Sequence, residues 1–243
     1  MQTLAFLPLL DWLALASFLT MWIGYTLIAR HWQKSKPTIA NQLAANRKEW
    51  IEQMIERDVR ISDITSLGIL QRNVTFFAST TIFIIAGLLT VLGSSNKAIQ
   101  LLKSLPWIEV ESHASWEIKV LLLVVSFSYA FFKFTWAMRQ YNFCIVLFGA
   151  APQANSNKKD KILFIKHCNW LLTRATNSFN YGLRAYSFAL AALCWFINAW
   201  VFIACSSFVV WVLYRREFKS NTLAALYNAS HHNNEKPLSE NSD

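Results

Sequence analysis

Four long runs of uncharged, mostly apolar residues divide the chain, and polar stretches separate them. An α-helix rises about 1.5 Å per residue, so about twenty such residues cross a hydrocarbon core of about 30 Å. The pattern therefore predicts four membrane-spanning helices. They cover residues 12–29, 74–92, 118–136 and 186–213.

Two further segments repeat apolar residues at helical spacing but carry many charges. Residues 39–72, with Thr38 as a helix cap, and residues 161–184 are therefore predicted to be amphipathic helices on the cytoplasmic side. The first leads directly into the second span, so we expect one continuous helix over residues 46–93. Together the elements predict an all-α membrane protein, with one membrane domain over residues 1–219 and a polar, disordered tail over residues 220–243.

The composition supports a membrane protein and argues against other classes. Apolar residues make up 54% of the 243 residues and charged residues 15%, against roughly 25% charged residues in soluble proteins. The net charge of +9 arises from Lys and Arg that flank the apolar runs, which is typical of cytoplasmic loops beside anionic phospholipid headgroups. No nucleic-acid-binding motif accompanies them. We therefore expect the lipid bilayer as a partner, and no nucleic acid.

The distribution of basic residues also predicts an orientation. With the N-terminus outside, residues 30–73 place eight Lys and Arg inside and residues 139–184 place seven, whereas the segment after the second span carries two. Four spans would then return the C-terminus to the outside. That outcome is the weak point, because Arg215, Arg216 and Lys219 would follow the last span on the wrong side.

The charged helix before the second span has two interpretations. Glu56, Arg60 and Asp63 stand four and three residues apart, which is the spacing of an ion-pair ladder on a solvated helix face. Alternatively, the arginines bind phosphate oxygens of a headgroup or another anion, because guanidinium groups suit such oxygens. The candidate headgroup or anion contacts are Arg47, Arg57, Arg60, Arg72 and Arg139.

Apolar residues of the same segment form a candidate interaction seam. Trp50, Met54 and Ile61 fall four and seven residues apart, so a continuous helix would place them on one face. A second subunit that buried this seam would make the protein a homo-oligomer.

Polar residues within the predicted spans are few. Ser79, Thr80 and Asn198 are candidate intramembrane contacts, which hydrogen-bond within the bundle or line a polar path. Asp11 at the start of the first span is either a helix cap or a buried functional carboxylate. Small residues at four-residue spacing predict close helix packing in the same span, and these are Ala16, Thr20 and Gly24.

Cysteine and histidine give no sign of a metal site, a cofactor or a nucleophile. The four cysteines form no C-x-x-C motif. His167 precedes Cys168 directly, but neighbouring helical residues point about 100° apart, so the two side chains do not converge. We expect no metal and no cofactor.

Several stretches resemble one bacterial family. They are Asp11-Trp12, R-K-E-W-I-E-Q-M-I-E-R-D-V-R-I-S-D from residue 47, F-F-A-S-T-T from residue 76, A-G-L-L-T-V-L-G from residue 86, R-Q-Y-N-F from residue 139 and G-A-A-P from residue 149. The family is an uncharacterised one of four-span inner-membrane proteins, and the resemblance covers residues 5–215. The resemblance implies a multi-pass protein of the bacterial inner membrane and implies no reaction. The charge distribution then predicts a periplasmic N-terminus.

The sequence favours a non-enzymatic protein that oligomerises or binds a partner through the seam. Two alternatives stay open. One is an oligomeric channel or transporter that prefers anions, based on the polar span residues and the basic cytoplasmic segments. The other is an enzyme that acts on lipids or phosphates through Arg57, Asp58, Arg60 and Asp63, although motifs such as H-E-x-x-H and G-x-S-x-G are missing.

Overall fold

The computed structural model of the chain describes residues 7–32, 38–94 and 113–219, and every regular element within them is a helix. This confirms the predicted all-α fold. Three helices are long, namely α3 (Ile61–Gly93), α5 (His113–Gly149) and α6 (Lys158–Leu193). The others are α1 (Leu9–Trp32), α2 (Ile39–Ile55), the short 3-10 helix η1 (Cys194–Phe196) and α7 (Ala199–Phe218). The predicted tail over residues 220–243 lies outside the described residues.

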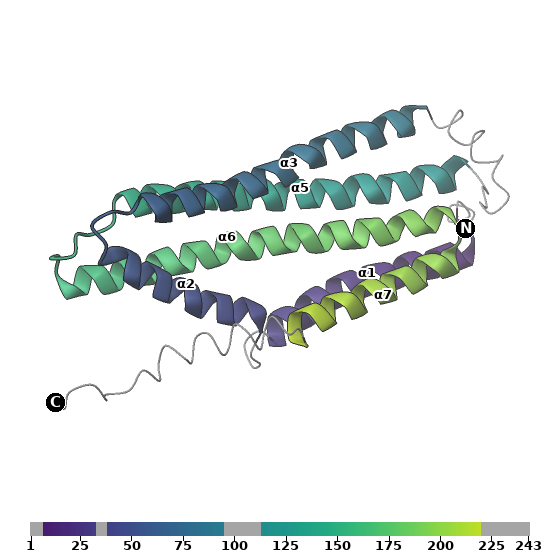
Figure 1. Cartoon of the computed structure of the whole chain (residues 1–243). Coiled ribbons are helices and arrows are strands. Elements are labelled where there is room, and N and C mark those ends of the chain that lie inside the picture. The colour runs from purple at the N-terminus through teal and green to yellow at the C-terminus, as the bar shows by residue number, and fades with distance from the viewer. Residues whose placement is uncertain (1–6, 33–37, 95–112, 220–243) are drawn as a thin grey trace.

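The helices form an elongated bundle with two different ends (Figure 1). α3, α5 and α6 lie side by side along its length, with α5 in contact with both of the others. α1 and α7 form a pair beside α6 at one end, and α2 lies beside α6 at the other. We call these the η1 end and the α2 end.

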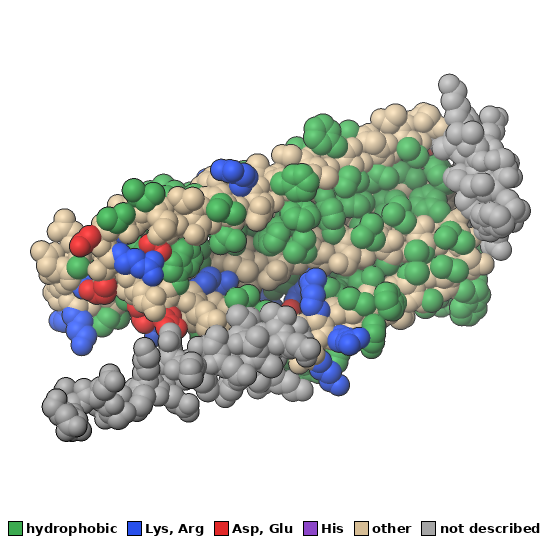
Figure 2. Space-filling view, in the orientation of Figure 1, with side chains coloured by type: hydrophobic (Ala, Val, Ile, Leu, Met, Phe, Trp, Pro, Cys, Tyr) green, Lys and Arg blue, Asp and Glu red, His purple; other side chains and the backbone are tan. Residues whose placement is uncertain are grey.

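Four of the described helices, α1, α3, α5 and α7, are long and apolar enough to cross a membrane. The face shown in Figure 2 is rich in apolar side chains toward the η1 end, whereas charged side chains gather toward the α2 end. The chain is therefore a multi-pass membrane protein with a charged region at its α2 end.

α2 and α3 are separate helices, so the continuous helix predicted over residues 46–93 is wrong. α2 begins as expected at Thr38, whose hydroxyl accepts a hydrogen bond from the backbone N–H of Asn41 at 3.2 Å. The chain then turns over residues 56–60. Helical spacing does not continue through a turn, so the predicted ion-pair ladder does not form. Glu56 instead pairs with Lys161 of α6 at 2.7 Å.

The fourth predicted span, over residues 186–213, is also wrong as a single helix. α6 extends the predicted amphipathic segment to Leu193, and residues 194–198 turn the chain into α7. Asn198 stands at that turn, where its side chain accepts a hydrogen bond from the backbone N–H of Trp200 at 2.8 Å. It is a helix cap and not a mid-membrane amide.

The length of α6 determines the end of the bundle at which α7 begins. α6 runs antiparallel to α5 from the α2 end to the η1 end, and α7 then returns toward the α2 end (Figure 1). α1 and α7 are thus parallel neighbours. At their starts Trp195 donates a hydrogen bond to Asp11, and at their ends the rings of Trp32 and Phe218 lie 5.5 Å apart. α1 therefore begins at the η1 end, whereas α7 ends toward the α2 end. The prediction that both termini lie on one side of the membrane stays a prediction, because residues 1–6 and 220–243 lie outside the described residues.

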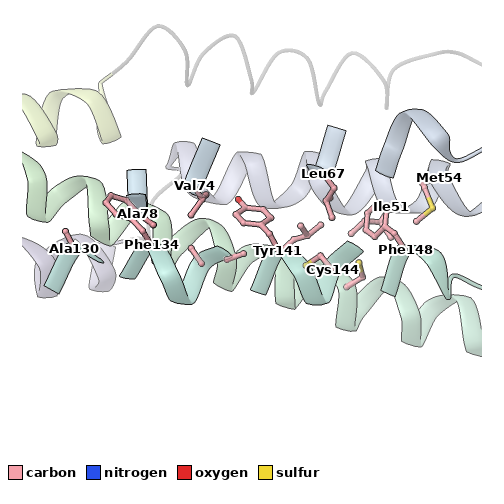
Figure 3. Close-up of a cluster of buried hydrophobic side chains, with 14 of the residues drawn as sticks. Ile51, Met54, Leu67, Val74, Ala78, Ala130, Phe134, Tyr141, Cys144 and Phe148 are labelled. Atoms are coloured by element: carbon pink, nitrogen blue, oxygen red, sulfur yellow. The ribbon is translucent and has the colours of Figure 1, made fainter. Parts of the chain in front are cut away.

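Among the described residues, two large clusters of buried apolar side chains hold the bundle together, and a small third one contains Trp116 and Val120. The largest follows α5 between α3 and α6, with α2 at one end, and Figure 3 shows it from Ala130 to Phe148 along α5. The second joins α1 and α7 to α5 and α6 near the η1 end. α6 approaches α5 closely at Gly182, where a Cβ atom would lie only 2.4 Å from the Phe134 ring. Only glycine fits this approach.

Candidate anion-binding site

A pocket of about 490 Å³ lies between α2 and the first half of α6. α2 contributes Lys48 and Glu52, and the other lining residues belong to α6. The wall combines cationic, hydroxyl, amide and apolar side chains. From α6 these are Ile162, Ile165, Lys166, Asn169, Trp170 and Thr173.

The charges of the pocket wall are mostly positive. Lys48 and Lys166 supply two cations, and the single carboxylate, Glu52, lies 3.6 Å from the ammonium of Lys48. Arg174 places its guanidinium 4.8 Å from the centre of the Trp170 ring. The mouth therefore presents positive charge beside an aromatic surface, which favours an anion with an apolar part.

Arg47 lies directly behind this wall and has an unusual environment for a cation. Its guanidinium donates to the hydroxyls of Thr176 at 3.1 Å and Thr173 at 3.5 Å. Tyr141 of α5 lies beyond, with its hydroxyl 3.2 Å from that of Thr176. Among the residues that the structure describes, no carboxylate forms an ion pair with Arg47.

The electrostatics of Arg47 agree with this geometry. Burial lowers the pKa of Arg47 below its ordinary value, and Tyr141 opposes that shift only in part. A buried guanidinium stays protonated, so the lowered pKa means that the cation is insufficiently solvated and has too little opposite charge. Its Nε is buried and lacks a hydrogen-bond acceptor among the described residues. An anion next to Thr173 would supply the missing charge.

A second unsatisfied group lies in the pocket wall itself. The buried Oδ1 of Asn169 also lacks a hydrogen-bond partner among the described groups. A side-chain amide presents either an acceptor or two donors after a half-turn about its last torsion. Buried polar atoms without partners are rare in folded proteins, so the two around this pocket indicate space for a polar ligand.

Arg57 and Asp63, which sequence reasoning assigned to an anion site or to catalysis, bind each other. The guanidinium of Arg57 lies 2.7 Å from Oδ1 of Asp63, and Trp50 Nε1 donates to the same oxygen at 2.7 Å. Asp63 is only 2% exposed, so it does not open onto a cleft. The group joins α2 to α3 across the turn and leaves no carboxylate pair for a metal. We call it the Asp63 cluster.

Arg60 directs four of its five guanidinium N–H donors into the protein, and its role as a headgroup contact stays a prediction. Its guanidinium donates to four backbone carbonyls. They belong to Ala151 at 3.0 Å, Pro152 at 2.8 Å, Ile55 at 3.0 Å and Arg57 at 3.3 Å. Arg60 therefore fastens the α2–α3 turn to the segment after α5, and it satisfies carbonyls that the ends of both helices leave open.

Arg72 and Arg139 are exposed on α3 and α5. Arg139 places its guanidinium 5.6 Å from the centre of the Phe143 ring on its own helix. Neither lines the pocket between α2 and α6. Their role as headgroup contacts stays a prediction.

The candidate seam does not form one face. Met54 is fully buried in the core, Trp50 packs on Phe148 with ring centroids 5.6 Å apart, and Ile61 at the start of α3 is 73% exposed. The turn after α2 rotates Ile61 away from the other two. Met54 therefore offers no surface to a second subunit, and Trp50 packs within the chain with only part of its side chain exposed.

The span residues proposed for a polar path do not meet either. Ser79 is exposed on the outside of α3, and Thr80 donates to the carbonyl of Phe76 in its own helix at 2.8 Å. Asn198 caps α7 at the η1 end. The hydroxyl of Thr81 makes the interhelical contact instead, 2.6 Å from that of Tyr186.

Of the two interpretations of Asp11, the structure favours the buried carboxylate, and it adds two partners that were not predicted from the sequence. Asp11 is 4% exposed and accepts a hydrogen bond from Trp195 Nε1 at 2.7 Å, while the ammonium of Lys119 lies 3.8 Å from its other oxygen. α1 already begins at Leu9, so Asp11 is not the helix cap. A lysine near the start of the third apolar run was the available signal. We call this group the Asp11 cluster.

His167 and Cys168 do not form a catalytic pair. His167 is exposed, whereas Cys168 is fully buried, and burial raises the pKa of its thiol to about 12. A thiol with that pKa is not a nucleophile near neutral pH. Among the described residues no three His, Cys, Asp or Glu side chains gather as a metal site would require.

Comparison with known proteins identifies a family but no activity. Residues 13–222 match the model of a family described as "Protein of unknown function, DUF599". No curated protein and no solved structure matches the chain. The match covers most of the chain and agrees with the resemblance to an uncharacterised family. The chain therefore belongs to the DUF599 family.

Proposed function

We propose that this protein is a non-enzymatic membrane protein that binds an anion, such as a phosphate-bearing molecule, in the pocket between α2 and α6. The observation that carries the proposal is Arg47, a largely buried cation without an ion-pair partner among the described residues. Lys48 and Lys166 add positive charge at the wall. A phosphate or carboxylate would satisfy guanidinium and ammonium donors together.

The proposal includes an orientation in a bacterial inner membrane, with the α2 end in the cytoplasm. Lys and Arg gather at that end, as the positive-inside rule requires. α7 ends there as well, so Arg215 and Arg216 join the other basic residues. The difficulty that a four-span arrangement creates for these residues disappears when α6 counts as a fifth crossing. The N-terminus is then periplasmic and the pocket is cytoplasmic.

The experiment compares Arg47→Gln with Arg72→Gln in full-length protein held in phosphatidylcholine nanodiscs. Isothermal titration with inorganic phosphate measures the affinity for a free anion. Native mass spectrometry of protein from phosphatidylglycerol nanodiscs measures a retained anionic lipid. We expect Arg47→Gln to weaken whichever of the two binds by at least about tenfold, because a charge-assisted hydrogen bond is lost.

Arg72→Gln is the matched control, because it removes the same charge from an exposed position on α3. Lys166→Gln at the exposed pocket wall weakens binding without disturbing the buried contacts behind it. Equal affinities for wild type and Arg47→Gln would refute the proposal. So would an equal loss in Arg72→Gln, which would indicate diffuse charge attraction. Wild-type protein that binds neither probe would refute it too.

Homo-oligomerisation stays a prediction, and the same native spectra test it through the mass of the intact particle. Met54 cannot carry the contact, because it is fully buried, and Trp50 is only partly exposed. A subunit contact would mainly use other exposed residues of the helices.

A further inference from the structure

A groove of about 510 Å³ runs along the outside of the α1–α7 pair, separate from the pocket between α2 and α6. Its walls come from the second halves of both helices. They include Gly24, Ile28 and Trp32 of α1, and Val210, Trp211 and Phe218 of α7. Sequence spacing predicted that Ala16, Thr20 and Gly24 pack against another helix. Ala16 and Thr20 are instead exposed, and Gly24 lines the groove.

The groove offers mostly hydrocarbon and aromatic surface. Thr20 donates to the carbonyl of Ala16 at 2.8 Å, and Ser207 donates to that of Ile203 at 2.9 Å. The Thr20 and Ser207 hydroxyl hydrogens are therefore used within the helices, while Tyr25 and Tyr214 contribute aromatic rings with one hydroxyl each. A ligand in the groove makes mainly dispersion contacts, which suits an alkyl chain.

The position of the groove places it in one leaflet. α1 and α7 are parallel spans whose starts meet at the Asp11 cluster and whose ends meet where Trp32 packs on Phe218. About twenty residues cross the hydrocarbon core, so the second halves of these helices lie in the leaflet nearer the α2 end. Trp32 and Trp211 lie toward its surface, where tryptophan is enriched.

Positive charge stands at the end of the groove that reaches the membrane surface. The last turn of α1 carries Arg30, and the last turn of α7 carries Arg215 and Arg216, all three exposed. Arg215 lies over the ring of Trp211, a groove residue, at 5.6 Å. By helical spacing Arg30 lies on the face of α1 opposite the groove, so Arg215 is the arginine beside it. An apolar groove in one leaflet with this arginine at the headgroup level is complementary to an anionic phospholipid.

We propose that this groove binds one anionic phospholipid of the leaflet nearer the α2 end. An acyl chain lies along the α1–α7 groove, and the phosphate accepts hydrogen bonds from Arg215. The site is independent of Arg47 and of the proposed anion pocket.

Glycine provides a sharp test. Gly24 lies in the groove, and no atom lies within 4 Å of the position that its Cβ would occupy. Gly24→Leu therefore fills the groove without a clash inside the chain. Gly87→Leu is the matched control, because Gly87 in the membrane part of α3 has the same free space but lies outside the groove.

The measurement is native mass spectrometry of protein released from nanodiscs that contain equal amounts of phosphatidylglycerol and phosphatidylcholine. Wild type should retain one phosphatidylglycerol. Gly24→Leu should reduce that retention at least fivefold, whereas Gly87→Leu and Arg47→Gln should leave it unchanged. Arg215→Gln should remove the preference for phosphatidylglycerol over phosphatidylcholine, whereas Arg30→Gln, on the opposite face of α1, should leave it unchanged.

Three results would overturn the proposal. One is equal lipid retention in Gly24→Leu and wild type. Another is equal retention of both lipids by wild type. The third is a dimer that Gly24→Leu dissociates, because a second copy would then occupy the groove. Loss of phosphatidylglycerol in Arg47→Gln alone would assign the lipid to the pocket between α2 and α6 instead.

Discussion

The two ends of the bundle contain the same three-residue arrangement in different surroundings. In the Asp11 cluster, Trp195 Nε1 donates to Asp11 at 2.7 Å and Lys119 supplies the cation. In the Asp63 cluster, Trp50 Nε1 donates to Asp63 at 2.7 Å and Arg57 supplies the cation. Each carboxylate is buried, and each cluster joins two or more helices.

The clusters differ in where the cation lies. The Lys119 side chain is 9% exposed and the Arg57 side chain 44%. An exposed guanidinium that loses its partner becomes solvated by water, whereas a buried ammonium cannot. Breaking the contact between carboxylate and cation should therefore lower the free energy of unfolding far more in the Asp11 cluster than in the Asp63 cluster.

The largest effect should come from Asp11→Asn. It leaves Lys119 buried without a counter-charge, so we expect the free energy of unfolding to fall by about 3–5 kcal/mol. Unfolding in mixed micelles followed by tryptophan fluorescence measures the change. The double variant Asp11→Asn/Lys119→Met should recover most of the loss, because the uncompensated charge is then absent. A double variant no more stable than Asp11→Asn would contradict this account.

Gly182→Ala should have the second-largest effect on stability. It tests the close approach of α6 to α5, the two long helices that run between the ends. The new Cβ would lie 2.4 Å from the ring of Phe134, which is fully buried and cannot move aside. We expect a loss of about 3 kcal/mol, at the upper end for overpacked cores. Gly68→Ala on α3 has no atom within 4 Å and should not destabilise the protein. Equal stabilities of the two variants in the same unfolding assay would disprove the close approach.

Asp63→Asn should lower the free energy of unfolding by less than Asp11→Asn. It removes a charged hydrogen-bond partner of Arg57, and we expect a loss of about 2 kcal/mol. Arg57 can turn to water, and Trp50 can still donate to the amide oxygen. Proteolysis in the turn over residues 56–60, followed by mass spectrometry, reports local opening there. A loss as large as that of Asp11→Asn would remove the distinction between the clusters.

Trp50→Phe should have the smallest effect, about 1 kcal/mol, because it removes one hydrogen bond and leaves Arg57 on Asp63. Trp195→Phe should cost more, since Trp195 is fully buried and its carboxylate partner keeps only the longer contact to Lys119. The ratio of the two losses, measured by the same unfolding assay, sharpens the comparison. Equal losses would mean that burial of the cation is unimportant.

The parts of the fold that rest on uninterrupted apolar runs could be predicted from the sequence. The spans predicted over residues 12–29, 74–92 and 118–136 lie within α1, α3 and α5. The full length of α6 and its place inside the bundle were not predicted, because an amphipathic pattern is the same whether its apolar side faces a membrane surface or another helix. Arg184 is an example of a charged residue that the pattern does not show to be buried. It is 6% exposed within α6, pairs with Glu217 of α7 at 3.8 Å and lies over the ring of Tyr25 in α1.

The candidate site was predictable only in part. Arg47 was among the arginines proposed for an anion, because guanidinium chemistry is visible in a sequence. Arg57 and Arg60 were indistinguishable from it, since their partners depend on the turn over residues 56–60 and on carbonyls about ninety residues away. The pocket itself required the pairing of α2 with α6. No spacing rule connects those two helices.

The course of α6 also bears on how the protein enters the membrane during synthesis. α6 is not among the described helices that are apolar enough to cross alone, yet it runs from the α2 end to the η1 end. A helix of this kind is inserted poorly as an independent segment. With α6 as the proposed fifth crossing, α5 and α6 should enter together as a helical hairpin, with the buried side of α6 covered by α5 before lipid reaches it. α7 then follows as the segment that fixes the hairpin in place.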